Sequence, residues 1–311
     1  MKILITGGAG FIGRHLASRL LKEGQEVVIL DNFYNSRIED IKFLLENKKI
    51  MLIKGDIIDV SLLESALSGI DVVVHLAAII DVQKSIEDPL TTNYVNVQGT
   101  LNLLEQSIRK DVKKFVFASS TAVYGDSNVL PLTEDLPLNP ISPYAASKAA
   151  SELYCKVYNK VYNLETVVLR YFNVYGFGKQ ASTYSGVINK FAENIKNNLP
   201  LTIYGDGEQT RDFIYIDDVV DATTRAIYSN GLGGEVMNVA TGRPTRIKDL
   251  AKLMLRIAGK EDLCIFYEKP RKGDIKQNYG STDKAKKLLG FEAKVKIEEG
   301  ITIILKSYGL A

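Results

Sequence analysis

Short apolar runs and amphipathic stretches alternate along the first part of the chain. Residues 2–6 form a β-rich apolar run, and a glycine cluster separates them from residues 11–22, whose apolar positions recur at helical spacing. Gly24 then interrupts the chain before a second apolar run at 27–30. This order predicts a strand, a tight turn, a helix and a second strand.

The same alternation repeats for about 170 residues. Its strands are largely continuous apolar runs, which is typical of a parallel sheet that helices cover on both faces. We therefore predict an α/β fold whose main part is a Rossmann-type, doubly wound parallel sheet. The further strands predicted are 51–54, 72–76, 114–118 and 166–170, and the further helices are 62–67, 93–110 and 144–162.

Beyond this part the alternation stops. Residues 174–184 are rich in Gly and Tyr, a helix is predicted at 187–197, and a glycine-rich turn follows at 204–207. Residues 236–240 fit one more strand of the main sheet, whereas the chain from Thr245 onward mixes helices and loops. A second, smaller lobe of mixed α/β structure is therefore expected. The main domain is expected to comprise 1–171 plus 214–240, and the smaller lobe 172–213 plus 241–311.

Composition narrows the class of protein. The side chains are 46% hydrophobic and 24% charged, and the formal net charge is +2. This balance is ordinary for a soluble globular protein, and no basic excess indicates nucleic acid as a partner. No apolar run reaches the ~18 residues that a membrane span needs, so no membrane association is expected.

The N-terminus and the cysteines carry further expectations. The chain enters a strand at once, which leaves no room for a signal peptide. Cys155 and Cys264 are too few for a disulfide framework, so we expect a cytoplasmic protein in which Cys155 serves core packing. With two histidines and no CxxC pair, no metal site is expected.

Three glycines follow the first predicted strand. Gly7 permits a sharp exit from the strand, Gly10 lets the backbone approach a pyrophosphate, and Gly13 allows the helix to pack close to the sheet. The helix that begins here offers N–H groups and a partial positive charge to phosphates. A simple turn would explain an isolated glycine triplet, but the strand before it and the helix after it favour a dinucleotide site.

Carboxylates follow the second and third strands. Asp31 stands 24 positions after Gly7, where a carboxylate accepts hydrogen bonds from the adenosine ribose and repels the 2′-phosphate of NADP. NAD is therefore the expected cofactor, although Arg37 further along is a residue type that NADP would favour. Asp56 and Ile57 either flank the adenine, or Asp56 caps a helix.

A catalytic set is predicted on the long helix. Tyr144 and Lys148 are four residues apart, so they share one helix face, and the ammonium of Lys148 can lower the pKa of Tyr144 toward working pH. Ser120 ends a predicted strand. Its hydroxyl either shares a proton or hydrogen bond with a substrate oxygen, or it only caps the strand end.

These residues resemble those of the extended short-chain dehydrogenase/reductases, and more narrowly those of the UDP-glucose 4-epimerases. The resemblance covers essentially the whole chain and is specific for enzymes of nucleotide sugars. Besides the glycine motif, Ser120 and the Tyr144–Lys148 pair, the segments that carry it are 31–32, 75–78, 96–100, 119–125, 170–173, 211–213 and 271–274.

The resemblance implies roles for further residues. The backbone N–H groups of Phe11 and Ile12 would meet the pyrophosphate, and two guanidinium groups would hold a substrate diphosphate, for which their fixed forks are suited. Surface salt bridges are the alternative for these arginines. The adenosine end would involve Asn32, Asn35 and Ser36; the dinucleotide Leu76, Ala77, Ala78 and Asn96; the nicotinamide Phe172; and the substrate Asn173, Arg211, Arg271, Asp274 and Asn278.

The reaction follows from what the motifs lack. Related 4,6-dehydratases carry an Asp-Glu pair after the hydroxyl residue, and related decarboxylases carry a Glu there, whereas this chain has Thr121 and Ala122. Tyr144, Ser120 and NAD suffice for reversible oxidation of one carbinol. The expected activity is inversion at C4 of a UDP-hexose through a transient 4-keto sugar. A net oxidoreductase acting on a nucleotide sugar and a non-catalytic NAD-binding scaffold remain the alternatives.

Substrate range and assembly are expectations from the same resemblance. Asn278 stands where strict galactose-type enzymes have a bulky Tyr, so it leaves room for an N-acetyl group on C2. Ile80 stands where some epimerases have a Lys. A homodimer is expected through helices 93–110 and 144–162.

Overall fold

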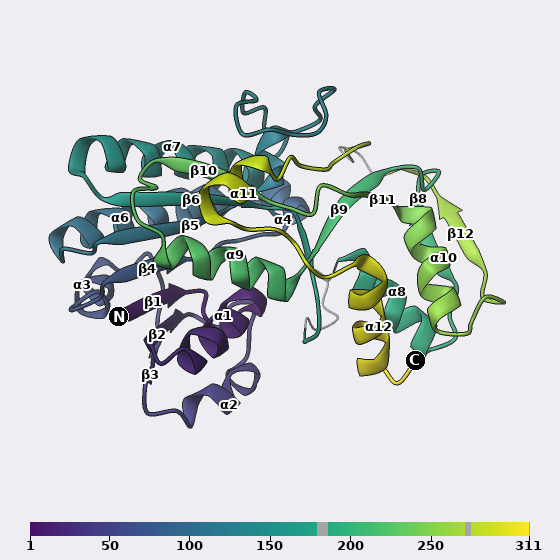
Figure 1. The fold of residues 1–311 in the computed structure, drawn as a ribbon, viewed down its shortest axis with the longest axis horizontal. Helices are drawn as coiled ribbons and strands as arrows, with labels where there is room; N and C mark the ends of the chain where they lie inside the picture. The colour runs from purple at the N-terminus through teal and green to yellow at the C-terminus, as the bar shows by residue number, and fades with distance from the viewer. Residues whose placement is uncertain (179–185, 271–274, 311) are drawn as a thin grey trace.

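The main sheet runs through the centre of the larger part of the molecule (Figure 1). The computed structural model describes residues 1–178, 186–270 and 275–310. Seven strands pair in parallel in the order β10-β6-β5-β4-β1-β2-β3, which is the doubly wound order. Their bounds are β1 (Lys2–Thr6), β2 (Glu26–Asp31), β3 (Ile50–Lys54), β4 (Val72–His75), β5 (Lys114–Ser120), β6 (Glu165–Tyr171) and β10 (Glu235–Val239).

Alternate strand residues supply two cores, one on each face of this sheet. Ile3 and Ile5 of β1 pack with the helices of one face, whereas Leu4 between them packs with those of the other. Because both faces are covered, consecutive positions in the middle of the central strands are apolar, and this explains their apolar runs. One face carries α1 (Phe11–Lys22), α2 (Lys42–Leu45) and α9 (Ile216–Tyr228), and the other carries α3 (Val60–Ala66), α6 (Gly99–Arg109) and α7 (Pro143–Tyr162).

Short helices fill the connections at the carboxyl edge of the sheet. After β4, two helices lead into a π-helical turn that continues directly into α6. A π-helical turn inside a longer helix frequently marks a functional site. These elements are α4 (Val82–Glu87), α5 (Pro89–Asn93) and the π-turn Tyr94–Gln98; the 3₁₀ turns are Ile38–Asp40 and Thr121–Tyr124.

The smaller lobe lies on the right in Figure 1, and its described residues form two small sheets and three helices. One sheet has the order β11-β9-β7, and the other pairs β12 with β8. The strands are β7 (Asn173–Tyr175), β8 (Leu201–Tyr204), β9 (Thr210–Tyr215), β11 (Pro244–Arg246) and β12 (Ile265–Glu268), and the helices are α8 (Val187–Lys196), α10 (Ile247–Ile257) and α12 (Ile297–Ser307).

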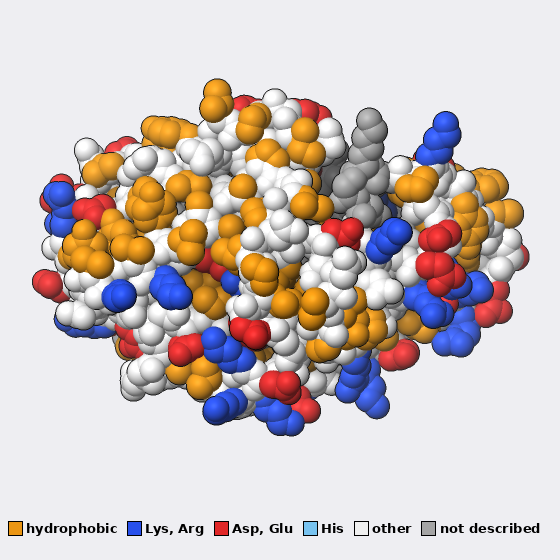
Figure 2. All heavy atoms as spheres, turned by 90° about the horizontal axis from the view of Figure 1, so that it is seen from above, with side chains coloured by type: hydrophobic (Ala, Val, Ile, Leu, Met, Phe, Trp, Pro, Cys, Tyr) orange, Lys and Arg blue, Asp and Glu red, His pale blue; other side chains and the backbone are white. Residues whose placement is uncertain are grey.

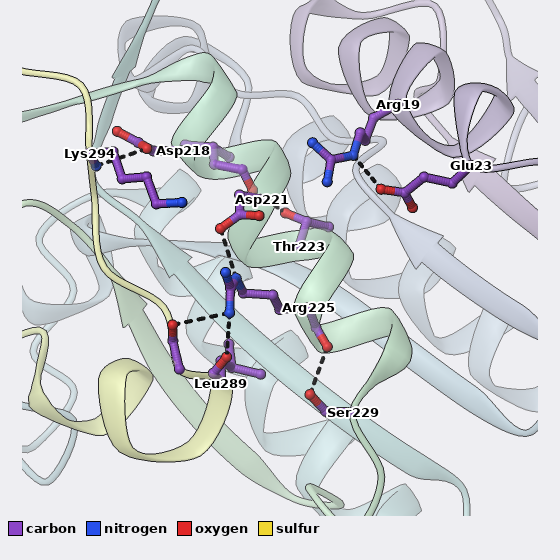
Figure 3. Close-up of polar contacts among 11 residues, drawn as sticks. Arg19, Glu23, Asp218, Asp221, Thr223, Arg225, Ser229, Leu289 and Lys294 are labelled. Carbon is purple, nitrogen blue, oxygen red and sulfur yellow. Dashed lines mark hydrogen bonds and ion pairs between the residues drawn. The ribbon is translucent and has the colours of Figure 1, made fainter.

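The C-terminal segment returns from the lobe to the main sheet before it ends. Helix α11 (Asp283–Leu289) packs on β10 and α9. In Figure 3 the guanidinium of Arg225 pairs with Asp221 at 2.7 Å and donates to the carbonyl of Leu289 at 3.2 Å. Asp218 accepts the backbone N–H of Lys294 at 3.0 Å. Helix α9 therefore holds the segment that leads from α11 back to α12 in the smaller lobe.

The predicted strands of the main sheet, including the last one at 236–240, and the predicted helices 11–22, 62–67 and 144–162 are confirmed to within two residues at each end. The sequence pattern did not predict α9, whose apolar positions are interrupted by charged residues, or the short strands β7, β8, β9, β11 and β12. It also predicted one helix at 93–110, where the structure has a π-turn followed by α6. Within the described residues, no helix is both long and apolar enough to cross a membrane.

Candidate active site

One cavity of ≈ 1470 Å³ follows the carboxyl ends of the central strands and continues into the smaller lobe. In open parallel sheets this edge is where ligands bind. Its lining begins at the glycine turn after β1, passes Ser120 and Tyr144, and reaches Arg211 and Asn278 in the lobe. Residues predicted for a cofactor, for catalysis and for a substrate therefore share one continuous space.

The glycine turn is as close-packed as the sequence predicts. Gly7 has φ +67°, and a Cβ on it would lie 2.8 Å from the backbone nitrogen of Ala77. A Cβ on Gly13 would lie 2.4 Å from the carbonyl oxygen of Gly7. Phe11 and Ile12, in the first turn of α1, line the cavity together with Gly10. This bare backbone at a helix N-terminus fits a pyrophosphate.

Asp31 anchors the glycine turn to the loop that follows β2. Its carboxylate accepts the backbone N–H of Ala9 at 2.9 Å, the N–H of Phe33 at 2.8 Å and the Ser36 hydroxyl at 3.0 Å. An ionised carboxylate has about four acceptor positions, so capacity for a ribose hydroxyl remains. Asp31 is buried and lines the cavity, as the expected NAD site requires.

Asp56 and its neighbours form the far end of the same site. Asn32 donates to Asp56 at 2.8 Å, and Asp56 also accepts the N–H of Ile58 at 3.1 Å. The cap of α3 is instead Asp59, which accepts the N–H of Leu62 at 3.0 Å, so the capping alternative for Asp56 is wrong. Asn32, Asn35, Ser36, Asp56 and Ile57 all line the cavity.

Asn96 supports the backbone of the segment after β4 and does not itself line the cavity, among the described residues. It lies in the π-turn, accepts the N–H of Ile79 at 2.8 Å, and donates to the carbonyl of Ile79 and to Ser147, both at 2.9 Å. Leu76, Ala77 and Ala78 line the cavity, whereas Asn96 is buried beneath them and is not part of the lining among the described residues. Its side chain therefore fixes the segment before α4 against helix α7.

Lys148 is a buried cation at the catalytic end of the cavity. Its ammonium donates to the carbonyl of Ala118 at 2.8 Å and lies 4.9 Å from the centre of the Phe117 ring. Burial lowers the pKa of Lys148 to about 8, although Glu152 one helical turn further acts in the opposite direction. Lys148 is therefore still largely protonated at neutral pH.

Tyr144 and Ser120 interact at the catalytic end of the cavity. Burial raises the pKa of Tyr144, and its hydrogen bond with the Ser120 hydroxyl opposes that shift. The prediction that the pKa of Tyr144 lies below its ordinary value is thus not met by the protein's own groups, because burial is the larger effect. Ser120 also accepts the N–H of Ala122 at 3.2 Å, so it caps the 3₁₀ turn in addition to contacting Tyr144.

A buried ion pair that the sequence analysis missed lies behind these residues. Glu152 accepts Arg170 at 2.7 Å, and both side chains are about 4% exposed. Ser119, next to Ser120, donates to the same carboxylate. A signal was present, because Glu152 follows Lys148 by one helical turn. Cys155, one turn closer to the end of α7, is fully buried, and burial raises its pKa, which agrees with core packing.

The substrate side is assembled from separate segments. Phe172 packs against Gly280, where a Cβ would lie 2.5 Å from the ring, and Asn173 begins β7. Arg211 on β9 donates to the carbonyls of Thr210 and Ile275, both at 2.7 Å. Phe172, Asn173, Arg211 and Asn278 all line the cavity, whereas Arg271 and Asp274 lie outside the described residues.

Asn278 lies beside the catalytic strand end. Its Oδ1 accepts the Thr121 hydroxyl at 3.1 Å, and the residue is 3% exposed. Among the described residues, no acceptor is present for its amide nitrogen. Thr121, the residue after Ser120, therefore holds one end of the Asn278 amide while the other end lies at the cavity.

Comparison with known proteins agrees with this geometry. Residues 3–240 match the sequence profile of the NAD dependent epimerase/dehydratase family. A putative UDP-glucose 4-epimerase of Methanocaldococcus jannaschii is 40% identical over 301 residues, which cover 96% of this chain and 95% of that protein.

Solved structures with the same fold carry related ligands. A UDP-glucose 4-epimerase of Thermotoga maritima with UDP-glucose has a TM-score of 0.94 at 37% identity and covers 99% of both chains. A UDP-N-acetylglucosamine 4-epimerase of Methanobrevibacter ruminantium has 0.91 at 36%, covering 98% of this chain and 97% of that one. A UDP-glucuronic acid 4-epimerase of Bacillus cereus with UDP-glucuronic acid and NAD has 0.93 at 34%, covering 99% of both.

Proposed function

This chain belongs to the NAD-dependent epimerase/dehydratase family as an extended short-chain dehydrogenase/reductase of the UDP-glucose 4-epimerase type, and we propose that it interconverts UDP-glucose and UDP-galactose and also accepts UDP-N-acetylglucosamine. It is an NAD-dependent UDP-sugar 4-epimerase. The observation that carries the proposal is the single cavity that joins the glycine turn, Ser120, Tyr144 and the polar residues of the lobe.

The residues present fit NAD. The bare backbone from Gly7 to Gly13 accommodates a pyrophosphate, and Asp31 keeps acceptor capacity for the adenosine ribose while its charge disfavours a 2′-phosphate. Bound NAD supplies an acceptor for the hydride of the sugar carbon and returns that hydride later in the cycle. The protein contributes placement and electrostatics.

Tyr144 is the proposed proton-transfer group. It takes the proton of the C4 hydroxyl as that carbon is oxidised to a ketone, and it returns the proton when the carbon is reduced from its other face. Lys148, protonated at neutral pH, stabilises the phenolate that the first step needs. Ser120 hydrogen-bonds the phenol and is placed to hold the same sugar oxygen.

The lobe has a different task in this proposal. Arg211 and Asn173 hold the diphosphate, with Arg271 and Asp274 proposed from the sequence alone. An anchored diphosphate leaves the 4-keto sugar free to turn, so that either face can meet the cofactor. Binding at the nucleotide end therefore keeps the sugar near the cofactor while leaving the sugar ring free to turn.

Asn278 supports the acetylated substrate. Its amide nitrogen lies at the cavity, and Thr121 holds its oxygen, so a hydrogen-bond donor is offered to the sugar by a side chain of modest volume. Ile80 lines the cavity and is 51% exposed, so the contact that a Lys makes there in some epimerases is not available.

The test is turnover by the pure protein without added NAD. UDP-glucose, UDP-N-acetylglucosamine and UDP-glucuronic acid are supplied separately, and the 4-epimers are quantified by chromatography. We expect the first two to be converted and denaturation to release NAD⁺ or NADH. Net NADH formation would instead favour the oxidoreductase alternative, and NAD binding without any turnover would favour the scaffold. Conversion of UDP-glucuronic acid alone would overturn the proposed substrate range.

A homodimer is also proposed. Leu153, Val157 and Val161 form an exposed apolar stripe at four-residue spacing on α7, and α4 and α5 beside it expose Val82, Ile86 and Leu90. Figure 2, which views the molecule from this side, shows apolar side chains gathered on this face. Such a stripe fits its own copy across a two-fold axis. Helix α6 packs beside α7 and leaves Leu101 and Ile108 half-buried, so the proposed interface includes residues 93–110 as well as α7. Light scattering should give twice the chain mass, and Val157→Glu should give a monomer.

A further inference from the structure

Two residues outside the expected cofactor set meet at the groove that the dinucleotide would follow. The ammonium of Lys84 lies 4.4 Å from the centre of the Tyr34 ring, which is cation–π geometry. Tyr34 lies in the loop after β2 and lines the cavity, whereas Lys84 lies on α4 after β4. These loops come from strands that are not neighbours.

The sheet order shows what the contact spans. Strand β1 lies between β2 and β4, so the glycine turn that follows β1 lies between the two loops. The ends of β2 and β4 are two strand spacings apart, about 10 Å. A dinucleotide that runs from Asp31 after β2 to Tyr144 must cross this interval. The Tyr34–Lys84 contact joins the segments that follow the two strands on either side of this interval.

Each side of the contact is built on a fixed support. Asp31 and Asn32 accept the N–H groups of Phe33 and Tyr34, at 2.8 and 3.0 Å, and Phe33 is held at φ +59°. A bulky residue in the left-handed region is strained and persists only where its surroundings enforce it. This strained turn presents the Tyr34 ring toward α4.

Helix α4 is tied to the catalytic helix. The Ser85 hydroxyl, adjacent to Lys84, accepts the backbone N–H of Tyr144 at 3.1 Å, and Ser85 is fully buried. Asp81 caps the helix by accepting the N–H of Lys84 at 2.6 Å. Only the outer, flexible Lys84 side chain has to move for the contact to open.

We propose that Tyr34 and Lys84 form a clasp across the dinucleotide groove that slows release of the cofactor. The proposal rests on the placement of NAD along this groove. An epimerase returns its cofactor to the starting oxidation state in every turnover, so it has no need to exchange it. A clasp would keep the reduced cofactor with the keto sugar until the second half of the reaction.

The experiment measures NADH dissociation directly. Protein loaded with NADH is mixed with excess NAD⁺, and the loss of bound-NADH fluorescence gives the off-rate. Lys84→Met removes the charge but keeps an unbranched side chain of similar length, and Tyr34→Leu removes the ring. We expect each to raise the off-rate about two- to fivefold. The double variant should be no faster than the faster single variant, because either change breaks the same contact.

Matched variants keep the contact and serve as controls. Lys84→Arg retains a cation and Tyr34→Phe retains a ring, so both should stay within twofold of the parent. Three results would overturn the clasp. They are equal off-rates in all variants, additive effects in the double variant, and release from Lys84→Arg and Tyr34→Phe as fast as from Lys84→Met and Tyr34→Leu. A parent that binds no NADH would refute the groove placement itself. A parent that binds NADH and turns over, with unresponsive variants, would refute only the clasp.

Discussion

The two ends of the cavity are built in opposite ways. The cofactor end is made of short segments, namely the glycine turn, the loop after β2 and the segment after β4, and each of them directly follows one strand of the same sheet. The substrate end brings Asn173, Arg211 and Asn278 together from segments that are far apart in sequence. At the cofactor end the glycine turn presents backbone, whereas at the substrate end the proposed contacts are side chains from the lobe. The comparison indicates that cofactor choice resides in local geometry and substrate choice in tertiary assembly.

The largest expected effect is on kcat, from replacing Tyr144 where the two ends of the cavity meet. Tyr144→Phe should lower kcat by ~10²–10⁴-fold while both ends still bind their ligands, because only the proton-transfer group is lost. Steady-state kinetics measure kcat, the NAD content of the purified protein reports cofactor binding, and calorimetry measures UDP binding. Tyr154→Phe, on the exposed side of the same helix, is the control. Near-normal turnover of the Tyr144 variant would exclude it as the acid–base group.

Replacing Lys148 tests how its positive charge affects the pKa of Tyr144. Burial already raises the pKa of Tyr144. Lys148→Ala removes a cation that favours the phenolate, so the pKa of Tyr144 should rise further and the acid limb of the pH–rate profile should move to higher pH. Lys156→Ala, exposed on the same helix, should leave the profile in place. NAD content is measured in parallel, since Lys148 is also a proposed cofactor contact. An unmoved acid limb would contradict the electrostatic role.

Gly13→Ala tests the cofactor end alone. The added Cβ would lie 2.4 Å from the Gly7 carbonyl oxygen, so α1 must shift away from the turn. We expect a loss of about 1–3 kcal/mol in the free energy of unfolding, together with weaker NAD binding. Gly10→Ala, whose Cβ would meet the same oxygen at 3.1 Å, should destabilise less. Urea denaturation without cofactor measures both, and equal losses would show that helix packing at Gly13 is not limiting.

The smallest expected effect tests the substrate end. Asn278→Tyr places bulk beside Thr121 and should lower kcat/KM for UDP-N-acetylglucosamine about tenfold more than for UDP-glucose. Asn278→Ser keeps the space and should retain both activities to a similar extent. Parallel losses on the two substrates in the Tyr variant would move the determinant of substrate range away from position 278.

The sequence by itself determined the sheet, the glycine turn and the Tyr144–Lys148 spacing. The strands, turns and helices each carry their own apolar periodicity within about thirty residues, and two residues four apart share a helix face. The Asp31 position follows from the same local unit. Asp31 predicted NAD as the cofactor, and the resemblance of these motifs to a family extended the prediction to a 4-epimerase.

Only the tertiary structure decided how those parts interact. It showed that burial, and not Lys148, has the larger effect on the pKa of Tyr144, that Asp59 rather than Asp56 caps α3, and that Asn96 works through Ile79 and Ser147. It also revealed the Glu152–Arg170 pair, the Thr121–Asn278 bond and the Tyr34–Lys84 contact. The physical reason is that burial and charge pairing depend on groups from other strands, whose proximity the chain order does not record.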